Sequence, residues 1–107
     1  MGIPEAKEAC LGLLAMRARS HGELRERLAR KGFEPDVIDA ALSRLAEVGL
    51  VDDGAFAREW ALSRHRHSGR GTQALARELR ARGIADEHVE QALAGIAPED
   101  ERARAVE

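Results

Sequence analysis

The feature that most constrains this chain is an internal repeat with a spacing of 51 residues. Six residues of the first half each have a residue of the same kind 51 positions later. They are Leu24, Leu28, Gly32, Ile38, Ala41 and Leu42, which correspond to Leu75, Leu79, Gly83, Val89, Ala92 and Leu93. Such a repeat predicts similar units that stack along one direction and bury their apolar faces together. We therefore expect the Leu28/Leu79 and Leu42/Leu93 pairs to lie at equivalent buried positions.

Composition and periodicity predict that these units are helical. Alanine occurs 20 times, only ten residues are Val, Ile or Thr, and apolar residues recur at helical spacing. We expect helices at about 4–18, from Ser20 to Gly32, from Pro35 to near Gly49, from Asp52 or Asp53 onward, from Gly71 to Gly83, from Asp86 onward, and from Pro98 to Glu107. The predicted fold is all-α and elongated, with one three-helix repeat at 1–49, a second at 50–97 and the start of a third at 98–107.

Local signals mark several of these helix ends. Ser20 and Glu23 have the spacing of a capping box, in which each side chain accepts a hydrogen bond from the other residue's backbone amide. Gly32 and Gly83 each follow a basic residue, so we expect both to have positive φ as helix C-caps. Between the first helix of the first repeat and the first helix of the second, the offset is 47 and not 51. The second repeat therefore has four extra residues, which we place in a loop within His65–Arg70.

The net charge is −2, but the charges fall in blocks. Residues 17–31 carry six basic side chains against two acids, and residues 58–82 carry seven arginines against two acids. Guanidinium groups suit protein carboxylates and DNA phosphates equally, so these blocks predict a partner-binding surface. Its members in the second repeat are Arg64, Arg66, Arg70, Arg77, Arg80 and Arg82, and the equivalent surface of the first repeat holds Arg25, Arg27, Arg30 and Lys31. A merely solvated surface would carry the same pattern.

Three stretches carry a more specific pattern. They are Ser20-x2-Glu23-Leu24-x3-Leu28-x2-Lys31-Gly32-Phe33, Gly49-Leu50-Val51-Asp52-Asp53-x2-Phe56-Ala57-x2-Trp60-x3-Arg64, and Gly71-x3-Leu75-x2-Glu78-Leu79-x2-Arg82-Gly83-Ile84. Together with the spacing of about 50 residues, they cover nearly the whole chain. In this pattern the sequence resembles the RecX family, bacterial regulators of the RecA recombinase.

The resemblance implies tandem three-helix repeats, normally three, in a protein that is not an enzyme and uses no cofactor. It implies binding to the RecA filament on single-stranded DNA. It also implies restraint of the ATPase, strand-exchange and co-protease activities of RecA in recombination and the SOS response. Because this chain stops at the start of the third repeat, we expect it to act more weakly than three repeats would.

Direct DNA binding is the alternative function, through non-specific contacts of the arginine blocks. Trp60 is the one aromatic residue of the second block, so base stacking is poorly provided for. Its side chain is predicted to lie in the core, and the alternative is a partly exposed anchor for a partner. Residues 24–42 have the spacing of a helix-turn-helix motif. However, the helix that would enter the major groove carries Asp36, Asp39 and Glu47, whose carboxylates repel phosphates. We therefore do not expect sequence-specific DNA binding.

No catalytic or metal site is predicted. His65 and His67 are two residues apart and would point to different sides of a helix. Cys10 lies on an apolar stripe, which favours a structural role in the core. A single cysteine favours a reducing compartment, and neither a membrane-spanning run nor a signal peptide is visible. We expect a cytoplasmic monomer without membrane contact.

Overall fold

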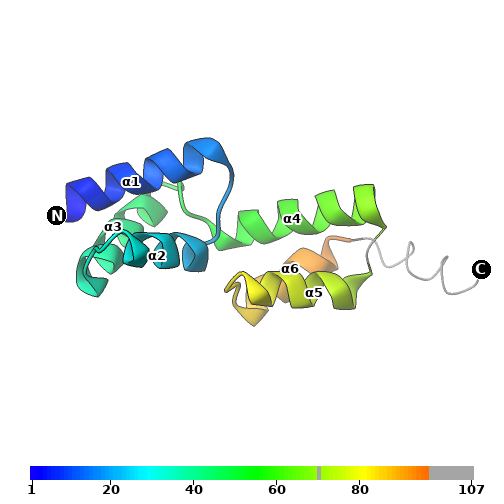
Figure 1. Cartoon of the computed structure of the whole chain (residues 1–107). Helices are drawn as coiled ribbons and strands as arrows, with labels where there is room; N and C mark the ends of the chain where they lie inside the picture. Colours follow the sequence, from blue (N-terminus) through cyan, green and yellow to red (C-terminus); the bar gives the residue numbers. More distant parts are fainter. Residues whose placement is uncertain (70, 97–107) are drawn as a thin grey trace, which may run out of the picture. The chain divides into compact units, whose positions relative to one another are not determined.

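The computed structural model describes residues 1–69 and 71–96. Regular structure in these ranges is helical throughout: α1 Ile3–Met16, α2 His21–Arg30, α3 Pro35–Glu47, α4 Asp53–Ser68, α5 Thr72–Ala81 and α6 Asp86–Ala94. The chain divides after Asp52 into two compact units, which hold α1–α3 and α4–α6 (Figure 1). The predicted all-α fold of three-helix repeats is confirmed. The helix expected from Pro98 lies outside the described residues.

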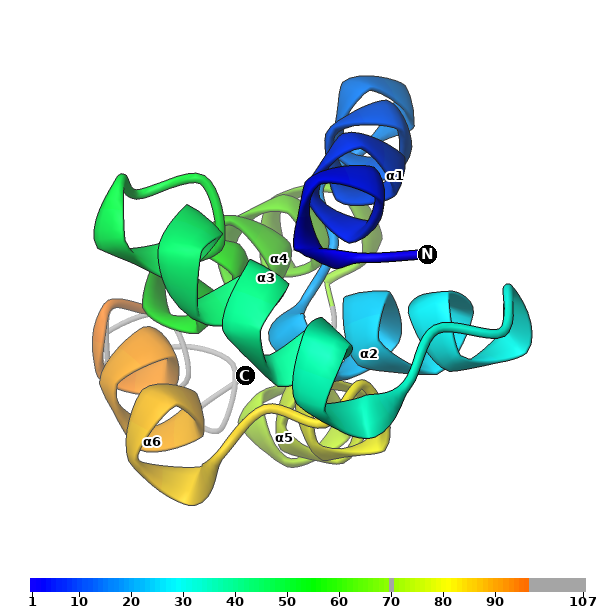
Figure 2. The ribbon, with the colours of Figure 1, turned by 90° about the vertical axis from the view of Figure 1, so that its left-hand side faces the viewer.

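Each unit has a hydrophobic core of its own. In the first unit every helix packs against the other two, and Figure 2 shows α1 above α2 and α3. The first core consists of Ala6, Cys10, Leu13, Leu24, Leu28, Phe33, Ile38, Ala41, Leu42, Leu45 and Val51. The second consists of Phe56, Ala57, Ala61, Leu75, Ala76, Leu79, Ile84, Val89, Ala92 and Ile96. The apolar stripes predicted from the periodicity are the faces that meet in these cores.

The repeat predicts the buried positions of α2 and α5 correctly. Leu28 and Leu79 are both fully buried, at 0% exposure. The second predicted pair is not equivalent, because Leu42 is fully buried whereas Leu93 is only partly buried at the edge of its core. The expectation that Leu42 and Leu93 share the same burial is therefore wrong.

The two repeats also differ on the helix that packs against the one carrying these leucines. Arg25 of α2 pairs with Asp39 of α3, so its side chain spans the two helices one turn away from Leu42. The residue 51 positions after Arg25 is Ala76. Its methyl group is too short to form such a bridge between α5 and α6.

The predicted capping box is present at the start of α2. The Ser20 hydroxyl oxygen accepts from the Glu23 amide at 3.1 Å, and the Glu23 carboxylate accepts from the Ser20 amide at 3.1 Å. Two of the amide groups that a helix start leaves without an intrahelical partner are thereby satisfied. The start of α2 is thus fixed by two residues three positions apart.

The predicted glycine caps are also confirmed. Gly32 has φ 97° and Gly83 has φ 83°, in the left-handed region that glycine reaches without strain. After α2 the Phe33 amide donates to the Leu28 carbonyl at 3.2 Å, and the corresponding bond after α5 measures 3.1 Å. Both helices therefore end in a Schellman motif, which satisfies carbonyls that the helix itself cannot.

Replacing Gly32 by Ala is expected to lower the free energy of unfolding by about 1 kcal/mol. A Cβ at this position would meet only a methionine methyl group at 3.5 Å, so the cost arises from the backbone conformation and not from crowding. Gly12, inside α1, is the matched control. Nothing lies within 4 Å of a Cβ there, so Gly12→Ala should instead stabilise by up to about 1 kcal/mol. Urea denaturation followed by circular dichroism measures both changes, and equal effects of the two substitutions would contradict this account.

The four extra residues of the second repeat lengthen a helix. At the offset of 47, the last residue of α1 corresponds to Ser63, yet α4 continues to Ser68. The helix has 16 residues against 14 in α1. The prediction of an inserted loop within His65–Arg70 is therefore largely wrong, because the residues up to Ser68, Arg66 among them, belong to α4.

Candidate partner-binding surface

The sequence-predicted arginines of the second unit come from α4, α5 and the residue after α5. Arg64 and Arg66 stand on α4, Arg77 and Arg80 on α5, and Arg82 follows as the C-cap residue of α5. Arg64 and Arg82 are partly buried, and the other three are exposed. Arg70 lies outside the described residues.

The Trp60 ring contacts two of these arginines at the edge of the second core. The Arg64 guanidinium carbon lies 4.2 Å from the centroid of the Trp60 ring, and that of Arg82 lies 3.9 Å from it. The Phe56 ring stacks on Trp60 at 5.8 Å, and the indole N–H donates to a Glu78 carboxylate oxygen at 3.0 Å. These contacts hold both guanidinium groups by cation–π attraction. Because the ring is already engaged, a nucleobase would have to displace an arginine to stack on it.

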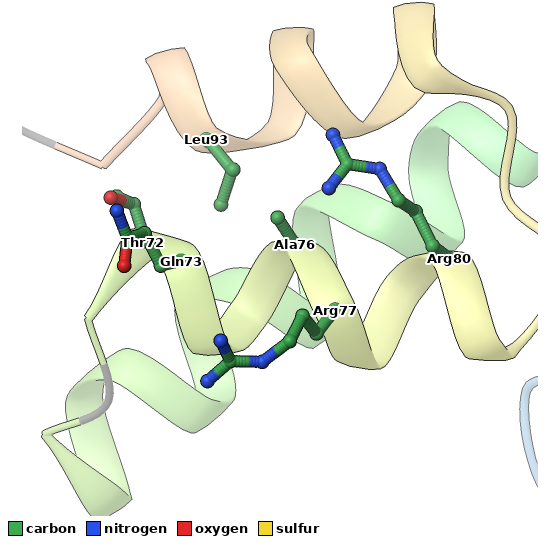
Figure 3. Close-up of a pocket in the computed structure, with 6 residues that line it drawn as sticks. All are labelled: Thr72, Gln73, Ala76, Arg77, Arg80 and Leu93. Atoms are coloured by element: carbon green, nitrogen blue, oxygen red, sulfur yellow. The ribbon is translucent and has the colours of Figure 1, made fainter.

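Arg77 and Arg80 border a groove between α5 and α6 (Figure 3). The groove has a volume of about 360 Å³ and is lined by Thr72, Gln73, Ala76, Arg77, Arg80 and Leu93. Figure 3 shows Leu93 pointing from α6 toward Ala76, with Arg80 reaching from α5 toward α6. The Arg80 Nε donates to an Asp86 carboxylate oxygen at 2.9 Å. The groove thus combines an apolar floor with positively charged edges.

The basic residues of the first unit are arranged differently. Arg25 pairs with Asp39, and Arg30 pairs with a glutamate one turn earlier at 2.6 Å. Arg27 and Lys31 are exposed and have no carboxylate partner in the part of the chain that the structure describes. Part of the basic charge of α2 is therefore already balanced within the unit.

Arg19 is a basic residue that the sequence does not single out. Its side chain is 5% exposed, and its Nε donates to the Leu13 carbonyl at 3.3 Å. Loss of hydration and the nearby charges of Arg17 and Arg27 lower the pKa of Arg19, while Glu23 acts in the opposite direction. These charged groups surround a cavity of about 90 Å³, which has room for a few water molecules.

Side chains that could bind a metal or act as a nucleophile are also present in residues 1–69 and 71–96. No three His, Cys, Asp or Glu residues in these ranges are grouped so that they could hold a metal ion. Cys10 is fully buried, and its burial raises the pKa of the thiol, which disfavours the nucleophilic thiolate. None of the described helices is both long enough and apolar enough to cross a membrane.

Arg77 and Arg80 of the groove are predicted from the sequence, but its floor is not. Leu93 is predicted from the repeat to be fully buried, and nothing in the sequence of the second repeat by itself marks Ala76, Thr72 or Gln73 as a binding residue. A position-by-position comparison of the repeats carries the signal, because Arg25 and Ala76 differ in length and charge at equivalent positions.

Two family models match the chain, one in each unit. Residues 6–45 match the first three-helix domain of RecX, and residues 52–93 match the second three-helix domain of RecX. Regulatory protein RecX of Mycolicibacterium smegmatis is 48% identical over 101 residues, which cover 94% of this chain and 54% of that protein. The protein of the same name from Mycobacteroides abscessus is 50% identical over 92 residues, which cover 86% of this chain and 45% of that protein. The chain thus spans about half the length of these relatives.

Solved structures show the same fold. A crystal structure of regulatory protein RecX superimposes with a TM-score of 0.85 at 22% identity, covering 91% of this chain and 49% of that one. The crystal structure of RecX from Lactobacillus salivarius gives a TM-score of 0.85 at 23% identity, covering 89% of this chain and 62% of that one.

Proposed function

Because the chain belongs to the RecX family, we propose that it is a non-enzymatic regulator of the RecA recombinase. In this proposal it binds the RecA filament on single-stranded DNA and restrains its ATPase, strand-exchange and co-protease activities. The name that its relatives carry, regulatory protein RecX, supports a regulatory role.

The observation that carries the binding mechanism is the set of exposed arginines on the second unit. Arg66 and Arg77 have no carboxylate partner among the described residues. Arg80 has one, but its side chain is 53% exposed, so solvent screens this pair and leaves it weak. Guanidinium groups in this state are available to carboxylates on the surface of a partner protein.

A pull-down with the immobilised chain tests the proposal. RecA is offered alone, with single-stranded DNA, and with DNA plus a slowly hydrolysed ATP analogue. We expect the strongest retention of RecA when all three are present. Failure to retain RecA under every condition would overturn the proposed function.

Salt dependence distinguishes the alternative, direct DNA binding. Binding to bare single-stranded DNA should then weaken steeply with salt, with a logarithmic slope of about −0.7 for each phosphate contacted. We expect instead weak retention of bare DNA at physiological salt. Equal retention of the DNA with and without RecA would favour a DNA-binding module.

A further inference from the structure

The groove between α5 and α6 has a chemistry that the first repeat lacks. Its floor is formed by Ala76 and Leu93, and Arg77 and Arg80 also line it. In Figure 3 the Arg80 side chain reaches toward α6, whereas that of Arg77 extends away from α6. Among the described residues, no acidic side chain lines it. At the equivalent positions of the first repeat, Arg25 pairs with Asp39, and Leu42 is fully buried. The second repeat therefore offers an apolar contact together with Arg77, which has no carboxylate partner among the described residues, and Arg80, whose pair with Asp86 is exposed.

The volume and the charge of the groove indicate its occupant. About 360 Å³ is at the small end of ligand-binding pockets and is enough for a few side chains. Arg77 has no carboxylate partner in the described part of the chain, and Arg80 uses only its Nε on Asp86. Both guanidinium groups can therefore donate hydrogen bonds to further carboxylates. Leu93 provides apolar surface that a phosphate backbone would not use.

We propose that this groove binds an acidic segment of a partner protein that places an apolar side chain between Ala76 and Leu93 and carboxylates beside Arg77 and Arg80. The inference rests on the proposed function, since the partner is taken to be RecA. It adds a recognition element, an apolar anchor, which general attraction between charges does not require.

The first repeat supplies the variant that tests the groove. Ala76→Arg gives the second repeat the arginine that the first repeat has at the equivalent position, Arg25. Glu90 occupies the position equivalent to Asp39, so the new arginine has a carboxylate with which to pair. This substitution fills the groove while making the chain more basic. Gln91→Arg adds the same charge at an exposed position of α6 that does not line the groove. Affinity is measured for the RecA filament assembled on single-stranded DNA with a slowly hydrolysed ATP analogue, and for the bare DNA.

We expect Ala76→Arg to weaken filament binding about tenfold and Gln91→Arg to leave it unchanged or tighter. If Ala76→Arg binds as Gln91→Arg does, the groove is not the contact, although the parent chain's binding still supports the proposed function. A parent chain that does not bind the filament overturns both. If Ala76→Arg changes the affinity for bare DNA by the same factor, the occupant is DNA and the protein-segment proposal is wrong.

A second pair of variants avoids the core altogether. Gln73 and Gln91 are both exposed helical glutamines of the second unit, but only Gln73 lines the groove. Gln73→Glu should weaken filament binding several-fold more than Gln91→Glu, because only the first carboxylate repels an acidic occupant. Equal effects of the two substitutions would overturn the proposal, even if Ala76→Arg fails to fold.

Discussion

Replacing Leu28 by Ala is expected to lower the free energy of unfolding of the first unit by about 2–5 kcal/mol. Leu28 is fully buried in a core shared by all three helices of that unit. Truncation removes apolar contact and leaves a cavity that a close-packed core closes only in part. A unit of some fifty residues has a total stability of only about 3–8 kcal/mol. The substitution should therefore bring the first unit close to unfolding.

Cys10 provides a local measurement of this effect. Its thiol is fully buried in the same core, and the second core contains no cysteine. A thiol reagent can reach it only when the first unit opens, so the labelling rate follows the opening equilibrium. A loss of 2 kcal/mol or more should speed labelling by about 30-fold or more. Urea denaturation followed by circular dichroism gives an independent value.

Leu79→Ala is the matched control, because Leu79 is the equivalent fully buried leucine of the second unit. It should shift the denaturation curve by a similar free energy but change Cys10 labelling far less, since it empties a cavity in the other core. Equal acceleration of Cys10 labelling by both substitutions would show that the two units open together. Unchanged labelling in Leu28→Ala would mean that this core tolerates the loss.

The fold could be predicted in detail because its signals are local. The capping box of α2 needs only Ser20 and Glu23, and the end of α2 needs a glycine at position 32 with a buried residue after it. Each of these features is decided by residues within five positions of one another. The offset of 51 then transfers the assignment from one repeat to the other. The α4 helix was predicted less well, because helix extension and loop insertion look alike in sequence.

The candidate surface was predicted by residue type but not by geometry. Arginine blocks mark where positive charge gathers, whereas Trp60 decides which guanidinium groups are held, through contacts between residues up to 22 positions apart. The groove is lined by a small residue, Ala76, which cannot form a pair with the neighbouring helix as Arg25 does with Asp39. An alanine on a core stripe gives no hint of this until the repeats are compared side by side.

Reversing the charge of Arg64, Arg77 and Arg80 together, each to Glu, is expected to weaken binding to the RecA filament by at least tenfold, which corresponds to about 1.4 kcal/mol. Arg77 and Arg80 border the groove, and Arg64 is held on Trp60. Glutamates at these positions would repel the carboxylates that the arginines are proposed to bind. Inhibition of the DNA-dependent ATPase of RecA measures the loss.

The fold of this triple variant should survive, so that the loss can be assigned to the surface. The exposed Arg80–Asp86 pair contributes under about 1 kcal/mol, and the cation–π contact of Arg64 contributes about 0.5–1 kcal/mol. A control with Lys7, Arg44 and Arg58 changed to Glu alters the net charge by the same amount outside the predicted surface. If both triple variants fold and inhibit RecA equally, only the overall charge matters and the arginines of α4 and α5 are merely solvated. A loss confined to the first variant places the RecA contact on the second unit.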